Sequence, residues 1–158
     1  MRMRILLWCV LLWSGLATAG VDDAVAAFSE GDFQTAEKEF HKLAEQGDAF
    51  AQFFLGFMYL EGQGVPQDYA QAMEWYRKAA AQGNTLAQVS LGFMYDKGQG
   101  VPQNHVLAYQ WMNLAAASGD KGAIKNRDLM VVKMTASQLE EAQRLAREWS
   151  AERAKEKQ

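Results

Sequence analysis

The feature that most constrains this chain is a tandem repeat of 36 residues. Residues 48–83 and 84–119 are identical at 19 of their 36 aligned positions. A partial copy precedes them in residues 30–47, and a glycine closes each of the three copies: Gly47, Gly83 and Gly119. Repeats of this length indicate pairs of helices that stack on one another, because one pair cannot bury its apolar face alone.

The first half of each copy predicts a helix. It follows an N-cap residue, Asp48 or Asn84. Apolar residues then recur at every fourth position, which marks one buried helical face: Ala51, Leu55 and Tyr59, and in the second copy Ala87, Leu91 and Tyr95. A glycine inside a helix costs about 1 kcal/mol relative to alanine. We therefore expect a neighbouring helix to approach closely at Gly56 and Gly92.

A Gly-Gln-Gly-Val-Pro-Gln loop separates this helix from a second one in each copy. Two glycines are expected to end the first helices, Gly62 and Gly98. Two more are expected to adopt positive φ within the loops, Gly64 and Gly100. Asp68 and Asn104 then cap the second helices, with Gln71 predicted to complete a capping box. These helices bury alanine and tryptophan at spacings of three and four: Ala72, Trp75 and Ala79, and Ala108, Trp111 and Ala115.

The residues from Ala51 to Gly83, and again from Ala87 to Gly119, resemble the Sel1-like repeat of the tetratricopeptide-related α-solenoids. The resemblance implies an all-α fold, a right-handed α-solenoid of antiparallel helix pairs that ends in a C-terminal capping helix. Similar exported bacterial proteins also end in a basic segment followed by a helix like the one at Met134 to Trp149.

Residues 1–19 are predicted to be a secretory signal peptide. Arg2 and Arg4 precede an apolar run, and small residues lead to a cleavage site before Gly20. The run is about half of the ~20 residues that a membrane-spanning helix needs, so a retained anchor is the weaker alternative. We expect an exported protein, in the periplasm or secreted, with no integral membrane segment once the signal is removed. Cleavage would also remove Cys9, the only cysteine.

These patterns divide the chain into five segments. They are the signal peptide (1–19), an N-terminal partial repeat or cap (20–47), two full repeats (48–83 and 84–119) and a C-terminal segment (120–158) that holds the capping helix and tail. A solenoid needs such a one-sided terminal element, because an uncovered repeat would leave its apolar face in water.

The capping helix has a clear start signal. Thr135 and Gln138 predict a capping box. The apolar residues that follow form one stripe on a helix whose other face is polar: Leu139, Ala142, Leu145, Ala146 and Trp149. This stripe is expected to cover the last repeat.

Composition argues against several functions. Residues 20–119 carry five Lys/Arg against twelve Asp/Glu, so nucleic-acid binding is not expected. His41 and His105, assigned to the surface, lie in different copies and do not have the spacing of metal ligands. The glycine loops lack the Lys-Ser/Thr of a P-loop. No serine has a nucleophile motif around it. We expect no metal, no cofactor and no catalytic residue.

The first helices carry a second apolar row besides the core stripe. Core filling is the default explanation for such a row. In helical-pair solenoids, however, the first helices tend to line the concave surface, where exposed aromatic residues indicate a binding site. The hypothesis places Phe54, Phe57 and Phe93 in a groove for a protein or peptide, with Glu61 and Lys97 at its rim.

Two functions remain open at this stage. The favoured one, implied by the resemblance, is a non-enzymatic adaptor of the bacterial cell envelope that binds another protein or a peptide. The alternative is a hydrolase of cell-wall material or β-lactams, by analogy with cysteine-rich secreted Sel1-like proteins. Those proteins pair a cysteine within each repeat, and this chain lacks these cysteines.

Overall fold

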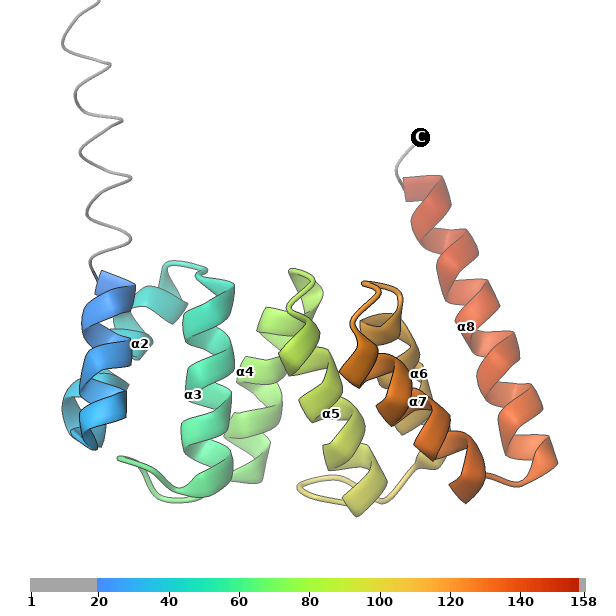
Figure 1. Cartoon of the computed structure of the whole chain (residues 1–158), viewed down its shortest axis with the longest axis horizontal. Helices are drawn as coiled ribbons and strands as arrows, with labels where there is room; N and C mark the ends of the chain where they lie inside the picture. The colour runs from blue at the N-terminus through green and yellow to red at the C-terminus, as the bar shows by residue number, and fades with distance from the viewer. Residues whose placement is uncertain (1–19, 157–158) are drawn as a thin grey trace, which may run out of the picture.

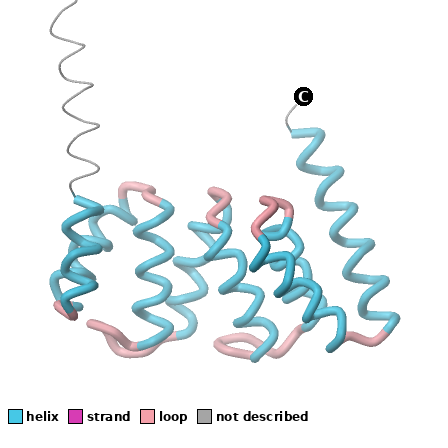
Figure 2. The backbone as a smooth tube through the Cα atoms, in the orientation of Figure 1, coloured by secondary structure: helices cyan, strands magenta, loops and turns pink. Residues whose placement is uncertain are grey.

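The computed structural model describes residues 20–156, and every regular element in that range is a helix (Figure 2). The expected signal peptide lies outside the described residues. A helix over residues 20–30 comes first. It is followed by α2 (Phe33–Glu45), α3 (Ala49–Glu61), α4 (Tyr69–Ala81), α5 (Thr85–Lys97), α6 (His105–Ala116), α7 (Lys121–Lys133) and α8 (Ala136–Glu156).

The helices form a solenoid of two layers (Figure 1). One layer holds the first helix of each pair: helix 20–30, α3, α5 and α7. The other layer holds the second helices: α2, α4, α6 and α8. Helix α3 contacts α5, and α5 contacts α7, so the first helices touch one another along the stack. Among the second helices, α8 contacts α6.

Helix ends follow the sequence signals closely. Asp48 and Asn84 accept hydrogen bonds from the amides of Ala51 and Ala87, at 2.8 and 2.9 Å. At the other ends of these helices, glycine adopts the left-handed conformation, with φ of 69° at Gly62 and 68° at Gly98. Each of the predicted caps of α3 and α5 is confirmed.

The second helices also begin at their predicted caps, with one difference. The side chain of Asp68 accepts bonds from the amides of Ala70 and Gln71. The amide of Asp68 itself donates to the carbonyl of Tyr59, at 2.9 Å. That amide is therefore not bonded to the side chain of Gln71. The predicted capping box is wrong in this second bond, whereas the bond from the Gln71 amide to Asp68 is present.

The glycines inside α3 and α5 permit close packing against the second helices. A Cβ added at Gly56 would lie 2.6 Å from the ring of Tyr76, and one at Gly92 would lie 2.7 Å from Cγ of Met112. Both distances are shorter than any normal contact. The expected close approach of a neighbouring helix is therefore confirmed in both repeats.

The glycine loops join each repeat to the one before it. Gly64 has φ of 74° and packs so tightly on the start of α2 that an added Cβ would lie 2.5 Å from the carbonyl oxygen of Phe33. Gly100 has φ of 72° and packs in the same way on Tyr69 at the start of α4. The two remaining glycine predictions are thus confirmed, and the loop contributes to stacking as well as to the turn.

Buried glutamines make a second connection between repeats, and the sequence did not reveal it. The side-chain amide of Gln52 donates to the carbonyl of Ala44, at 3.1 Å, and that of Gln88 donates to the carbonyl of Ala80, at 3.2 Å. Gln82 adds bonds to the carbonyl of Gly47 and to Oε1 of Gln52. These bonds satisfy carbonyl groups at the ends of the preceding second helices.

The predicted core residues lie inside the stack. The largest of the fully buried side chains are those of Tyr76, Phe40, Leu55, Met58, Leu91, Met94 and Met112. Trp75 is 8% exposed. Tyr59, Tyr95 and Trp111 are half-buried and pack against the cluster that contains Leu91. The core is continuous along the solenoid, because each cluster draws residues from adjacent pairs.

The C-terminal segment holds two helices rather than one capping helix and a tail. Helix α7 begins after the N-cap Asp120, 36 positions beyond Asn84, so it continues the repeat as another first helix. Arg127 stands at the position of Leu55 and Leu91, so the apolar pattern of a first helix is interrupted in this copy. Helix α8 then packs on α6.

The expected start of the cap is present in α8. The amide of Gln138 donates to Oγ1 of Thr135, at 3.2 Å, and the amide of Thr135 donates to Oε1 of Gln138, at 2.9 Å. Ala142 is fully buried, and Leu139 packs beside it. Trp149 lies outside the residues whose side chains are described.

Candidate partner-binding site

A hollow of 220 Å³ opens between the C-terminal halves of α3 and α5, on the layer of first helices. We call it the α3–α5 hollow. It is lined by Leu60, Glu61, Ser90, Phe93, Met94, Lys97 and Gln99. Three of the five predicted binding residues therefore meet here: Glu61, Phe93 and Lys97. The other lining residues, Ser90 among them, were not predicted as part of the site.

The hollow is present because the two copies of the repeat differ at one position. Ser90 occupies the position that Phe54 holds in the preceding repeat. We call the interface between two successive first helices a joint. At the joint between helix 20–30 and α3, the ring of Phe54 fills the interface and lies 5.4 Å from the ring of Phe28. Between α3 and α5, the small Ser90 side chain leaves the corresponding space open. In the sequence, the only sign of this hollow is that Ser90 stands where the preceding repeat has Phe54.

Phe54 and Phe57 lie in the packed N-terminal part of the solenoid, apart from the hollow. Phe54 stacks on the fully buried ring of Phe40, with centroids 4.8 Å apart and planes 13° apart. Phe57 lies 6.0 Å from Phe28. These contacts match the core-filling alternative for both residues. Phe93, by contrast, is 37% exposed, although it is the counterpart of Phe57.

Two opposite charges flank the hollow without an ion pair. Among residues 20–148, whose side chains the structure describes, neither Glu61 nor Lys97 makes a salt bridge or a side-chain hydrogen bond. One joint further on, the counterpart of Lys97 is Lys133, whose Nζ lies 2.5 Å from Oδ2 of Asp96. The first copy has Leu60 at the position of Asp96. Lys97 therefore has no equivalent of the Asp96 carboxylate with which Lys133 pairs.

A buried phenol lies close to the hollow. Tyr76 is fully buried, and its hydroxyl makes no hydrogen bond of normal geometry within the described residues. Burial raises the pKa of Tyr76, the nearby Ser90 hydroxyl lowers it in part, and the Glu61 carboxylate raises it further. Two lining residues of the α3–α5 hollow thus act on this phenol, although Tyr76 itself does not line the hollow.

A cluster of three charged or titratable groups closes the next joint, between α5 and α7. Asp96, with a side chain only 7% exposed, is contacted by Lys133 and by Nδ1 of His105 at 3.1 Å. His105 is 24% exposed and lies against a buried carboxylate, so the prediction of a simple surface position for it is wrong. His41 is 38% exposed and contacts Glu37 and Glu45 on its own helix.

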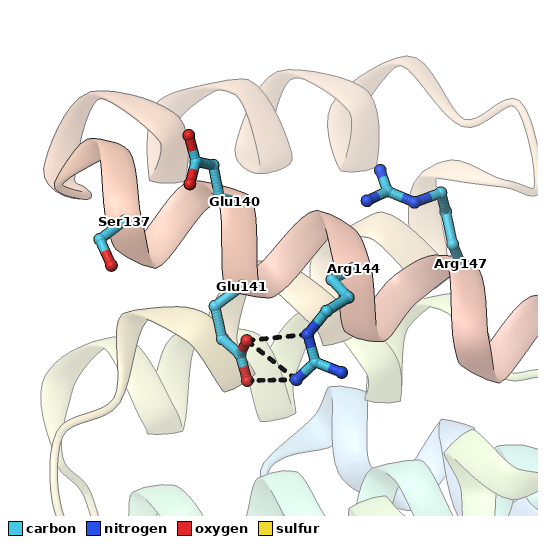
Figure 3. A pocket seen from close by; sticks show the side chains of 5 residues that line it. All are labelled: Ser137, Glu140, Glu141, Arg144 and Arg147. Carbon is cyan, nitrogen blue, oxygen red and sulfur yellow. Dashed lines mark hydrogen bonds and ion pairs between the residues drawn. The ribbon is translucent and has the colours of Figure 1, made fainter.

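Two other hollows lie on or beside α8. The one in Figure 3 is bordered by Ser137, Glu140, Glu141, Arg144 and Arg147, and two of its charged residues, Glu141 and Arg144, pair with each other. Arg144 donates to both oxygens of Glu141, at 2.8 and 2.9 Å, and also bonds Glu148. The second, between α6 and α8, is lined by Tyr109, Asn113, Gln143, Ala146 and Arg147. Neither includes a predicted binding residue.

Neither a metal site nor a membrane-spanning helix is found among the described residues. No group of three or more His, Cys, Asp or Glu residues among those described could hold a metal ion. Of the helices between residues 20 and 156, none combines the length and apolar character needed to cross a bilayer.

The repeat geometry agrees with a family comparison. The model of the Sel1 repeat matches residues 49–84 and 85–120, one residue later than the copies defined from the sequence. The chain belongs to the Sel1-repeat family. Proteins of this family generally act as scaffolds for protein interactions, and their fold is typically non-catalytic. A search of curated proteins found no match.

Solved structures support the same assignment. A protective antigen of uropathogenic Escherichia coli strains, displaying an SLR fold, superposes with a TM-score of 0.78 at 37% identity, over 84% of this chain and 29% of that one. A Sel1 repeat protein from Oxalobacter formigenes gives a TM-score of 0.57 at 38% identity, over 61% of this chain and 40% of that one. The chain thus spans less than half the length of either structure.

A third similar structure is cysteine rich protein B of Helicobacter pylori. It superposes with a TM-score of 0.57 at 21% identity, over 69% of this chain and 92% of that one. At this identity the likeness concerns the fold alone. The three comparisons together agree with the helical-repeat solenoid that the sequence predicted.

Proposed function

We propose that this Sel1-repeat protein is a non-enzymatic adaptor of the bacterial cell envelope, exported to the periplasm, which binds a protein or peptide on its layer of first helices. The observation that carries the proposal is the α3–α5 hollow. It combines the exposed ring of Phe93 with the unpaired charges of Glu61 and Lys97 on the layer of first helices. An apolar wall with polar groups at its rim is the usual composition of a protein-binding site.

Photo-crosslinking in cells tests this function. Phe93 is replaced by a photoreactive phenylalanine analogue, and the protein is irradiated in intact cells that express it with its own N-terminus. We expect a crosslinked partner in the envelope fraction, because the ring of Phe93 would lie at the centre of the contact. Mass spectrometry of the adduct identifies the partner and the crosslinked segment.

Two controls make the result specific. The same analogue at Lys38, an exposed position of α2 in the other layer, should give no such adduct. Adding Ser90→Phe to the Phe93 variant should suppress the adduct, because phenylalanine would fill the hollow as Phe54 fills the preceding joint. Equal adducts at both positions, or an adduct that Ser90→Phe leaves unchanged, would show that partners bind elsewhere.

A further inference from the structure

We infer that the α3–α5 hollow receives an arginine side chain from a basic segment of the partner. This inference rests on the proposed function and specifies the chemistry of the bound segment. It depends on three features of the described residues: the size and walls of the hollow, the charge around it, and the hydroxyl of Ser90 that lines it.

The size and walls of the hollow suit one long side chain. Its 220 Å³ exceed the ~150 Å³ of an engineered apolar cavity that binds benzene. The exposed ring of Phe93 offers a face for a flat guanidinium, an arrangement favoured by cation–π attraction. Leu60 and Met94 provide apolar contact for the methylene stem of arginine, which packs on apolar surface while its charged end remains polar.

The electrostatic field favours a cation. Residues 20–119 carry five Lys/Arg against twelve Asp/Glu, so this part of the chain has a net negative charge, which favours a cationic over an anionic ligand. At the hollow itself, Glu61 can accept two parallel hydrogen bonds from a guanidinium.

The hydroxyl of Ser90 can accept a hydrogen bond from the same ligand. Arginine presents five N–H donors and no acceptor, and Ser90 lines the hollow. Lys97 opposes the incoming charge from the other rim. The two rim residues should therefore have opposite effects on binding, which no purely apolar contact would produce.

Peptide binding tests the inference directly. The probes are blocked five-residue peptides, Gly-Leu-Arg-Leu-Gly and the same peptide with citrulline, lysine or glutamate at the centre. Dissociation constants are measured by amide NMR shifts of the signal-free protein. We expect arginine to bind about tenfold more tightly than its neutral isostere citrulline, because the charged bond to Glu61 is lost in the latter. The glutamate peptide should bind most weakly.

Variants separate the two rim charges. Glu61→Gln should weaken binding of the arginine peptide about tenfold, and Lys97→Gln should strengthen it a few-fold. Ser90→Phe should abolish it. The matched controls are Glu140→Gln on α8 and Lys38→Gln on α2, two remote exposed residues without ion pairs among the described residues. Both should bind the peptide as the unmodified protein does.

The outcomes distinguish this inference from the proposed function. Equal binding of arginine and citrulline, preference for glutamate, absence of binding by every peptide, or an unchanged affinity in Glu61→Gln would each overturn the inference. If a partner nevertheless crosslinks to residue 93, the adaptor function stands, and only the inference that an arginine side chain enters the hollow is wrong. If no partner crosslinks there while the arginine peptide still binds, the adaptor function fails and the hollow remains a cation site.

Discussion

At the scale of single residues, one substitution separates a filled joint from an open one. Phe54 stacks on Phe40 and meets Phe28, whereas Ser90 at the equivalent position leaves the α3–α5 hollow. A gap lined by packed side chains costs stability, because the atoms around it lose contacts. Retaining such a gap on an exposed layer is consistent with a role in binding.

Exchanging the two residues tests this contrast. Phe54→Ser should lower the free energy of unfolding by about 3 kcal/mol, because it removes a large ring from a packed cluster. Ser90→Phe should change stability by less than about 1 kcal/mol in either direction. Urea unfolding followed by circular dichroism gives both values. Similar losses for the two variants would mean that Ser90 already lies in a packed joint.

The buried phenol predicts a pH dependence at the same scale. Burial raises the pKa of Tyr76 above its ordinary value of 10.0. The unfolded chain therefore releases this proton at lower pH than the folded protein does. The contribution of Tyr76 is fully present below pH 10, and stability falls as pH rises through and above about 10.

Removing the hydroxyl should weaken that dependence. The unfolding free energy of Tyr76→Phe should fall less steeply between about pH 9 and 11 than that of the unmodified protein. Tyr69→Phe, which removes a half-buried phenol at the start of α4, serves as the control. An equally steep fall in Tyr76→Phe would show that this phenol is not the group responsible.

At the scale of helices, sequence periodicity predicted most of the elements because it reflects local physics. Caps such as Asp48 and glycines such as Gly62 act within one turn of the chain, and both were predicted correctly. Helix α7 was missed as a repeat helix, because Arg127 interrupts its apolar stripe. The Asp96 cluster was also missed, because its members come from three helices that only the tertiary fold brings together.

The ion pair between α5 and α7 can be tested by a double-mutant cycle. Lys133→Met should destabilise the protein by about 2 kcal/mol, since it leaves the buried carboxylate of Asp96 without its ammonium partner. Asp96→Leu introduces the residue of the first copy. The double variant should regain stability relative to Lys133→Met, because no buried charge remains.

One outcome of the double-mutant cycle would contradict a stabilising role for the pair of Asp96 and Lys133. If the double variant is no more stable than Lys133→Met in urea unfolding, then Asp96 is sufficiently stabilised by His105 or by solvent. The pair would in that case contribute little to holding α7 against the second repeat.

At the scale of the molecule, stability depends on neighbouring pairs covering each other. Helix α8 contributes Ala142, fully buried, to a cluster with Ala108, Tyr109, Met112 and Met130. Each pair contacts mainly its neighbours, so removal of a terminal element exposes the apolar face next to it. The sequence predicted this dependence, although not that α7 continues the repeat as another first helix before α8 packs on α6.

Deleting residues 136–158 should therefore lower the melting temperature and promote aggregation. The reason is exposure of the cluster around Met112 on α6. Melting followed by circular dichroism, with light scattering on the same sample, measures both effects. A truncated protein that keeps its helicity and its melting temperature would contradict the role of α8 as a cap.

The central claim is that a partner binds on the first helices at the α3–α5 hollow. Its most direct test is an amide NMR titration of the protein with the partner segment recovered by crosslinking at residue 93. We predict that the shifted amides cluster at Glu61, Ser90, Phe93 and Lys97, with little change in α2, α4 and α6. Shifts concentrated on those second helices or on α8 would contradict the claim.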